Sequence, residues 1–141
     1  MTGTGKCLCG AVTIATTGQP LGVVQCWCRQ CQTLAAGGPA HNAIFKSEDV
    51  AITGPLARCS YIAASGNTPT PHFCASCGTQ IHGLSSAVPQ LIAVRLGTLD
   101  QPHGLKPLVA IWTSEAPKWA VIDPALEQFA EQPLAPPPTN P

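Results

Sequence analysis

A mainly β fold with few short helices is what this sequence of 141 residues predicts. Three observations lead to it. Short segments rich in Val, Ile and Thr recur at small intervals and are bounded by turn residues. Glycine (13) and proline (15) are spread through the chain. No long segment repeats apolar residues with the period of about 3.6 residues that marks an amphipathic helix. The length suits a single domain.

The strands are expected in segments that alternate with turn residues. These segments are residues 11–16, 22–27, 41–46, 49–54, 59–63, 79–84 and 90–97. The best candidate for a helix is RQCQTLAAG, residues 29–37, which Gly37 and Gly38 would end. Residues 1–133 form the expected domain, and residues 134–141 read as a proline-rich tail, extended or disordered.

The charge balance excludes some classes of partner. Lys+Arg and Asp+Glu both number 7, and no basic stripe occurs, so binding to nucleic acid or to an anionic membrane is not expected. The start, MTGTGKCLCG, lacks the apolar run of a signal peptide, and no apolar stretch is long enough to span a membrane. We therefore expect a cytoplasmic protein, in which 8 cysteines indicate metal binding or catalysis rather than disulfides. The oligomeric state stays open, a homodimer being one option.

Two short cysteine pairs are each followed by a glycine: C-x-C-G at residues 7–10 and C-x-x-C-G at residues 74–78. On an extended chain, residues two apart point to the same side, so the first two sulfurs aim at one spot. A glycine after the second cysteine can take positive φ and lets backbone N–H groups approach the sulfurs. We expect the two pairs to be halves of one closed, structural zinc site. The predicted ligands are Cys7, Cys9, Cys74 and Cys77.

A second group, Cys26, Cys28 and Cys31, forms C-x-C-x-x-C. Three protein ligands with an open fourth position are typical of a catalytic zinc, and the open position can hold water or a thiol. The sequence thus predicts two zinc sites, with these three cysteines at the reactive one. Cys59 could instead complete the second site, although a lone cysteine in a strand-like segment is more often simply semi-buried.

Other interpretations of the cysteines are weaker. They could be buried free thiols that behave as small apolar groups. The C-x2-C-x2-C spacing of ferredoxin-type clusters does not occur. CRQC, residues 28–31, could begin a helix as in thioredoxin-like proteins, but the βαβ context is missing, which leaves thiol-based redox sensing as a minor alternative. No sequence feature links a particular histidine to a cysteine as a catalytic pair.

Together these motifs resemble the glutathione-dependent formaldehyde-activating enzyme family, whose domain the centromere protein V group shares. The resemblance rests on four motifs: C-x-C-G at residues 7–10, C-x-C-x-x-C at residues 26–31, F-C-x-x-C-G-T at residues 73–79 and G-T-L-D at residues 97–100. It continues through KPLVAIW (106–112) and APKW (116–119), and so covers roughly residues 3–133. It implies a small tent-like arrangement of β-sheets joined by zinc.

The resemblance also implies site residues and an activity. The family's structural zinc ligands fall on the four cysteines of the two glycine-punctuated pairs, and its second zinc falls on Cys26, Cys28 and Cys31. The implied activity is that of a carbon–sulfur lyase, which adds the thiol of glutathione to formaldehyde. Its partners would be a small thiol and a small aldehyde.

The sequence departs from the family pattern near the second site. Trp27 stands where a histidine is common, Gln32 replaces a basic residue, and Ala110 replaces a histidine before Ile-Trp. Fewer basic groups make the anionic tripeptide glutathione a less suitable substrate, and they favour a second hypothesis, a zinc-stabilised interaction module without catalysis. Arg29 could still steer an anion to the metal. His72 and His82 are candidate proton carriers, although an ordinary hydrogen-bonded role is more common.

Overall fold

The computed structural model describes residues 2–133, and within this range it contains eleven β-strands and one α-helix. The prediction of a mainly β fold with few short helices is confirmed. The predicted proline-rich tail, residues 134–141, lies outside the described residues. In the described part of the chain, no helix has the length and apolar character needed to cross a membrane.

The strands form two sheets. The smaller sheet is antiparallel in the order β1-β2-β5, and the larger has the order β11-β10-β3-β4-β9-β8-β7-β6. β10 runs parallel to both of its neighbours, and the other pairs are antiparallel. The strands are β1 (Thr2–Lys6), β2 (Thr13–Thr17), β3 (Gly22–Cys26), β4 (Ala40–Lys46), β5 (Val50–Thr53), β6 (Leu56–Arg58), β7 (Pro69–Cys74), β8 (Gln80–Ser85), β9 (Leu91–Arg95), β10 (Val109–Ile111) and β11 (Glu127–Gln128).

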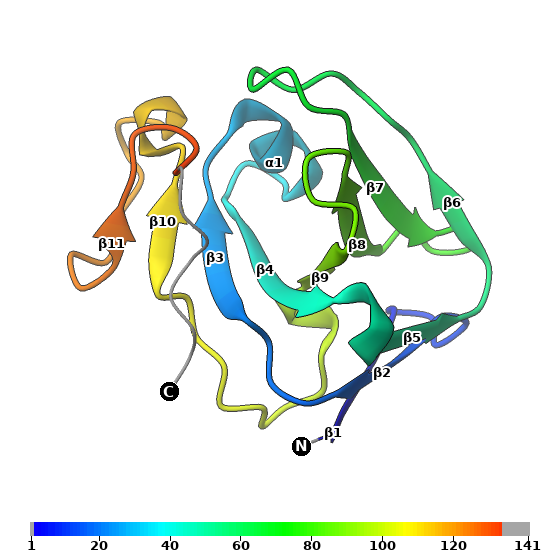
Figure 1. Ribbon diagram of the computed structural model, residues 1–141. Helices are drawn as coiled ribbons and strands as arrows, with labels where there is room; N and C mark the ends of the chain where they lie inside the picture. The colour runs from blue at the N-terminus through cyan, green and yellow to red at the C-terminus, as the bar shows by residue number, and fades with distance from the viewer. Residues whose placement is uncertain (1, 134–141) are drawn as a thin grey trace.

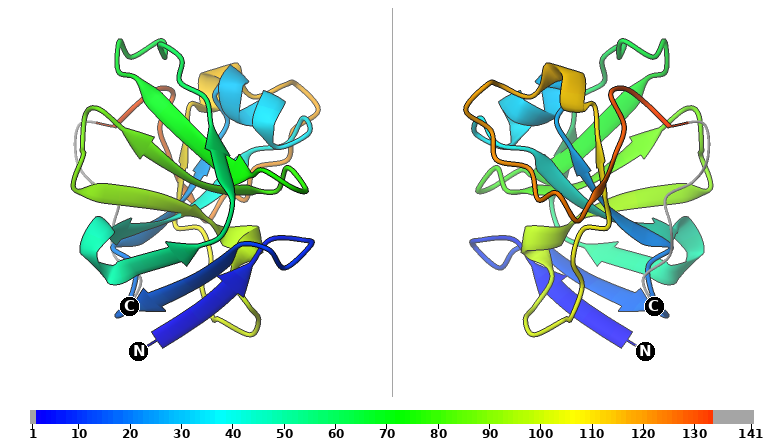
Figure 2. Two further views of the ribbon diagram at one scale, coloured as in Figure 1. Left: turned by 90° about the vertical axis from the view of Figure 1, so that its right-hand side faces the viewer. Right: turned by 90° about the vertical axis from the view of Figure 1, so that its left-hand side faces the viewer.

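The larger sheet curls around the middle of the molecule, from β11 at one edge to β6 at the other (Figure 1). The helix α1 (Arg29–Leu34) follows β3 and lies at one end of the molecule, whereas β1 and β2 lie at the opposite end (Figure 2). Three single 3₁₀ turns, at Ser47–Asp49, Leu96–Thr98 and Thr113–Glu115, follow β4, β9 and β10.

The apolar core has two parts, and each contains one group of cysteines. The larger part includes Phe45, Ile81 and Val94 together with Cys7 and Cys74. A smaller part lies between β3, β10 and α1; its buried members are Val24, Cys26, Cys31, Ala40, Val109 and Ile111. Alternation along the strands produces this burial, as in β2, where Ile14 and Thr16 face inward and their neighbours are exposed. Both cysteine groups are therefore anchored on strands whose inner face is fixed by the core.

One predicted strand, residues 59–63, is wrong. The strand ends at Arg58, and the chain beyond it donates two backbone hydrogen bonds, from Cys59 to the Pro71 carbonyl and from Tyr61 to the Pro69 carbonyl. Proline has no N–H, so neither residue of β7 can donate a bond in return. Hydrogen bonds therefore run in one direction only, from residues 59–61 to β7, and the segment stays irregular. The other predicted strands each overlap a strand of the structure.

The predicted helix begins at Arg29 as expected but ends three residues before Gly37, at Leu34. Ala36 (φ 58°) and Gly37 (φ 100°) both adopt left-handed backbone conformations that stop the helix. Five strands were not predicted: β1, β6, β7, β10 and β11. TGTGK carries little apolar signal, PTPHFC contains two prolines, and the other three strands are only two or three residues long.

The close approach of β1 to the turn after β9 yields a prediction. Gly5 is buried and pairs with Leu99 through an isolated bridge. A Cβ at Gly5 would collide with the backbone carbonyl of Thr98, whereas a Cβ at Gly97 would meet open space. We expect Gly5→Ala to lower the free energy of unfolding by about 1–3 kcal/mol and Gly97→Ala to leave it nearly unchanged. Urea denaturation of both variants measures the difference, and equal midpoints would contradict the packing described here.

Candidate metal centres

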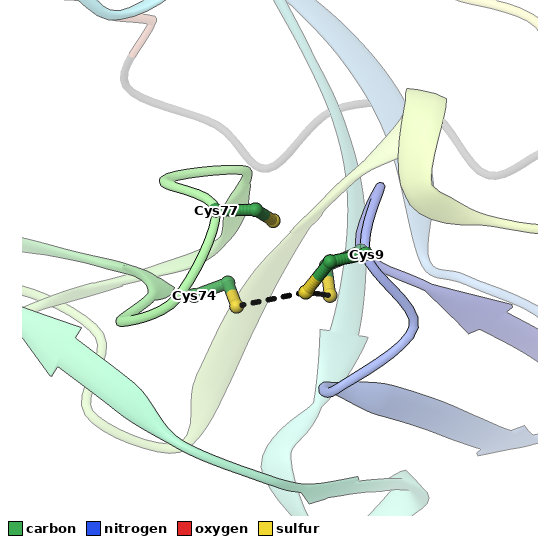
Figure 3. Close-up of side chains that lie close together, drawn as sticks. Cys9, Cys74 and Cys77 are labelled. Atoms are coloured by element: carbon green, nitrogen blue, oxygen red, sulfur yellow. Dashed lines mark hydrogen bonds between the residues drawn. The ribbon is translucent and has the colours of Figure 1, made fainter.

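Four cysteine sulfurs converge between two turns of the chain, one joining β1 to β2 and the other joining β7 to β8. All four lie within 4.8 Å of one another. The sulfurs of Cys7 and Cys9 are 3.5 Å apart, and those of Cys9 and Cys74 are 3.9 Å apart. Figure 3 shows the sulfurs of Cys9, Cys74 and Cys77 facing one another from the two turns. The structure thus brings together the four residues that the sequence singled out.

Backbone geometry in the two turns explains the glycines. Gly10 (φ 80°) and Gly78 (φ 77°) adopt the left-handed conformation that other residues rarely take. This lets Gly10 donate its N–H to the Cys7 carbonyl at 3.1 Å and Gly78 donate to the Cys74 carbonyl at 2.8 Å. The N–H of Val12 donates directly to the Cys7 sulfur at 3.2 Å. The turns therefore aim their sulfurs inward and supply hydrogen bonds that favour thiolates.

The thiols of this cluster do not ionise alike. Burial acts to raise the pKa of Cys7, but hydrogen bonds from Val12 and from neighbouring thiols outweigh it and lower the pKa. The hydroxyl and N–H of Thr79 lower the pKa of Cys77 to about 5. At Cys9 a backbone hydrogen bond lowers the pKa, but the adjacent thiols and burial raise it to about 11. The cluster thus favours some thiolates and resists complete ionisation unless a cation is present.

The donor set fits a tetrahedral metal ion. A zinc–sulfur distance of about 2.3 Å places the sulfurs of a tetrahedron about 3.8 Å apart. The spacings of 3.5 Å and 3.9 Å lie close to this value. Since four ligands complete a tetrahedron, this cluster could hold a metal ion with no position left for a substrate.

The second cluster is built where β3 passes into α1. Cys26 is the last residue of β3, Cys28 is the N-cap of α1, and Cys31 lies in its first turn. Their sulfurs also lie within 4.8 Å of one another. The Cys28 sulfur accepts a hydrogen bond from the N–H of Cys31 at 3.3 Å. Cys26 and Cys31 are buried, whereas Cys28 is partly exposed. The predicted three-cysteine group is therefore assembled, and its most accessible sulfur caps the helix.

Only one of these three thiols favours ionisation. Hydrogen bonds with Cys26 and Cys31 lower the pKa of Cys28 to about 3, against the opposing effect of burial. Hydrogen bonds with Cys28 and Cys31 raise the pKa of Cys26, and burial raises it further. At Cys31 a hydrogen bond with Cys26 lowers the pKa, but Cys28 and burial raise it to about 12. A metal cation would be needed for all three to become thiolates, and the group could hold one.

The three cysteines line a cavity of about 450 Å³. Side chains from the inner face of the larger sheet form another part of its lining, among them Asn42 on β4 and Arg95 on β9. The irregular segment after β6 contributes Tyr61, and the turn after β10 contributes Trp112. The cluster with three ligands therefore lies beside a space that can admit a small molecule.

Two residues of this cavity, Arg95 and Tyr61, were missed by the sequence analysis. The Nη1 of Arg95 donates a hydrogen bond to the Asn42 side chain at 2.5 Å. Burial, followed by the negative charge of Cys31 and Cys28, raises the pKa of Tyr61 to about 12, so its phenol stays protonated at neutral pH. A lone arginine in an apolar strand and the single tyrosine of the chain were the available signals.

The departures at Trp27, Gln32 and Ala110 have structural explanations. Trp27 is buried, and its Nε1 donates to the Gln25 side chain at 2.9 Å. The Gln32 amide donates to the backbone carbonyls of Trp27 at 2.7 Å and Glu115 at 2.9 Å. Ala110 is fully buried in β10. Gln32 therefore connects α1 to the chain around it, and none of the three residues carries a charge.

The remaining sequence candidates belong to neither cysteine cluster. Arg29 is exposed, and its guanidinium donates to the Gln32 side chain at 2.6 Å. The rings of His72 and His82 stack with their centroids 4.3 Å apart, and burial lowers the pKa of His82 to about 4. Cys59 is exposed and belongs to neither cluster, so the interpretation of this residue as semi-buried was wrong.

The fold and these centres define a class: a small β protein with one closed and one open cysteine cluster, the open one beside a cavity. The model of the family described as "Glutathione-dependent formaldehyde-activating enzyme" matches residues 2–115. The chain belongs to this family, as the sequence motifs indicated.

A solved structure shares the fold of this chain. A crystal structure of a Rhodobacter sphaeroides protein, a structural-genomics target, is 22% identical in sequence. The match covers 74% of this chain and 91% of that chain with a TM-score of 0.56, which shows a shared fold. No curated protein matches the chain significantly.

The two clusters should respond differently to loss of one ligand. Cys74→Ser removes a ligand that is buried in the core, so we expect a loss of more than about 4 kcal/mol of stability and of the metal that this cluster holds. Cys28→Ser keeps an oxygen acceptor at the N-cap of α1, where serine is favoured, so the fold should persist. Circular dichroism with thermal melting, together with elemental analysis, separates the two. Equal destabilisation by both changes would refute the division into closed and open clusters.

Proposed function

We propose that this protein is a zinc-dependent enzyme of the carbon–sulfur lyase type, which adds a thiol to a small aldehyde such as formaldehyde or releases it. The observation that carries the proposal is the cluster of Cys26, Cys28 and Cys31 on the wall of a cavity, with three ligands rather than four. Family membership supports the same reaction class. The closed cluster would hold a second zinc ion with a structural role.

The reaction needs no oxidant or reductant. A sulfur–carbon bond forms as the thiol sulfur attacks the carbonyl carbon, and the carbon–oxygen double bond becomes a single bond. The thiol proton ends on the oxygen, which gives a hydroxymethyl thioether. The barrier is therefore lowered by a group that favours the thiolate and by a group that supplies a proton or hydrogen bond to the oxygen.

The three cysteines would hold the zinc ion and leave one of four tetrahedral positions for the thiol. When bound, this ion supplies a positive charge that favours a thiolate and can polarise a carbonyl oxygen. Pro69, Pro71 and Leu84 give the cavity an apolar part of its lining, where a small aldehyde would find fewer competing waters.

Tyr61 is the group that we assign to the aldehyde oxygen. It lines the same cavity as the cysteines, and within residues 2–133 its hydroxyl has no hydrogen-bond partner. Because burial and the neighbouring cysteines keep the phenol protonated, it can donate to an oxygen on which negative charge develops.

A second candidate function is a zinc-stabilised interaction module without catalysis. The observation that favours it is that Trp27 and Gln32, where the family often has histidine and a basic residue, are engaged in structural hydrogen bonds, Trp27 with Gln25 and Gln32 with the Trp27 carbonyl. In this case both metals would be retained firmly, and added thiols would have no effect.

The zinc content of the purified protein distinguishes the two functions. We expect two zinc ions per chain, one for each cysteine cluster, in protein prepared without chelator. Dialysis against millimolar glutathione should remove one of them while circular dichroism stays unchanged, because the open site accepts a competing thiol. Two ions that both resist dialysis would instead favour the interaction module.

The role of Tyr61 is tested with Tyr61→Phe. Loss of the hydroxyl should lower kcat for thiol addition to formaldehyde by about 100-fold, with a smaller effect on the KM for the thiol. The adduct is followed by proton NMR, and rates are corrected for the uncatalysed reaction. Thermal melting checks that the variant folds, and an unchanged kcat would remove Tyr61 from the mechanism.

A further inference from the structure

Arg95 lies at the end of β9, directly opposite Asn42 of β4 in the sheet register. The bond from its Nη1 to the Asn42 side chain, at 2.5 Å, holds the guanidinium in one orientation. Asn42 is itself buried, with 9% of its surface exposed. An arginine that is oriented before any ligand arrives loses less entropy when it binds one.

The other side of the guanidinium faces a glycine. Gly83 on β8 lines the same cavity, and a Cβ built there would lie 3.6 Å from Nη2 of Arg95. A longer side chain at this position would cover the guanidinium. Since Asn42 accepts from one of the five N–H groups of an arginine, the others remain available to a molecule in the cavity.

The positive charge of Arg95 is not neutralised by a carboxylate of residues 2–133. Within this part of the chain, the guanidinium has one hydrogen bond, to Asn42, and electrostatic interactions with Cys31, Tyr61 and His82. Glu115 is the acidic residue in the described cavity lining, and its carboxylate accepts the backbone N–H of Arg29 at 2.6 Å. A partly buried cation that no carboxylate of the described chain pairs with, in a cavity beside the cysteine cluster, is typical of a binding site for an anionic ligand.

From these contacts we infer that Arg95 binds a single carboxylate of the thiol substrate while the thiol reaches the cluster of Cys26, Cys28 and Cys31. This inference rests on the proposed function and specifies its substrate class. The described lining carries one unpaired cation, which matches a small thiol with one carboxylate. Glutathione carries two carboxylates and an ammonium group, so we expect it to be a poorer substrate than a mercaptocarboxylate.

The structure also separates Arg95 from Arg29, which the sequence offered as the anion-steering residue. Arg29 is exposed and is engaged by Gln32, and it lies outside the described lining of the cavity. Replacing Arg29 should therefore leave the preference for anionic ligands intact.

The first experiment needs no catalytic activity. The metal-loaded protein is treated with iodoacetate or with its neutral isostere iodoacetamide, and alkylation of each cysteine is measured by peptide mass spectrometry. The readout is the ratio of the two rates at the cavity cysteines, with the exposed Cys59 as the reference within each sample. A bound carboxylate should raise this ratio in the wild type.

Matched variants assign the effect to one residue. Arg95→Gln should lower the ratio about 10-fold, because it removes a charge-assisted hydrogen bond. Arg95→Lys, which keeps the charge, should retain part of the preference, and it also serves if the glutamine variant folds poorly. Lys46→Gln, an equal change of charge at an exposed site outside the described lining, should have no effect. An unchanged ratio in folded Arg95→Gln overturns the inference.

A second experiment separates this inference from the proposed function. Hydroxymethylation by formaldehyde is compared for 3-mercaptopropionate, 3-mercaptopropionamide and glutathione. We expect the highest kcat/KM for the carboxylate, and its advantage over the amide should disappear in Arg95→Gln. If no thiol is turned over while the alkylation ratio still depends on Arg95, the function fails and the carboxylate site stands. If the thiols are turned over with equal kcat/KM in both proteins, the function stands and the site fails.

Discussion

The convergence of four cysteines from two distant turns is the constraint on which the rest of this structure depends. It connects the start of the smaller sheet to the β7–β8 turn of the larger one, across 65 residues between Cys9 and Cys74. Cys7 and Cys74 are also members of the larger apolar core, so the cluster and the core stabilise the same contact. A metal ion held there would contribute about 10–16 kcal/mol of apparent binding energy, much of it available for folding.

The second cluster has three cysteine ligands instead of four. It occupies the β3–α1 junction, where a short loop and the N-cap of one helix bring three sulfurs together without a fourth. The parallel strand β10 and the turn after it cover one side of this junction, and Gln32 connects α1 to that turn through the Glu115 carbonyl. This support leaves a set of three ligands beside the cavity, an arrangement that would suit a reactive metal centre.

The chemistry of the cavity depends on charge. Neutral Tyr61 and cationic Arg95 face a group of thiols that cannot all ionise without a cation. Such an arrangement stabilises negative charge at several points: at the sulfurs, at an oxygen near Tyr61 and at an anion near Arg95. The substitutions near the second site therefore need not abolish anion recognition, because the sheet supplies a cation from another strand.

The sequence by itself determined the fold class, most strands and both cysteine groups, because alternating apolar residues, glycine punctuation and ligand spacing are local signals. It also placed the start of α1 at Arg29. Only the tertiary structure decided which residues face the open cluster. Arg95 reaches the cavity because the sheet register pairs it with Asn42 of β4. Tyr61 reaches it from an irregular segment whose backbone bonds to the carbonyl of Pro69 in β7. Both pairings join residues that are distant in the sequence. Arg29, adjacent in sequence to the cysteines, points elsewhere for the same reason: proximity along the chain does not fix the direction of a side chain.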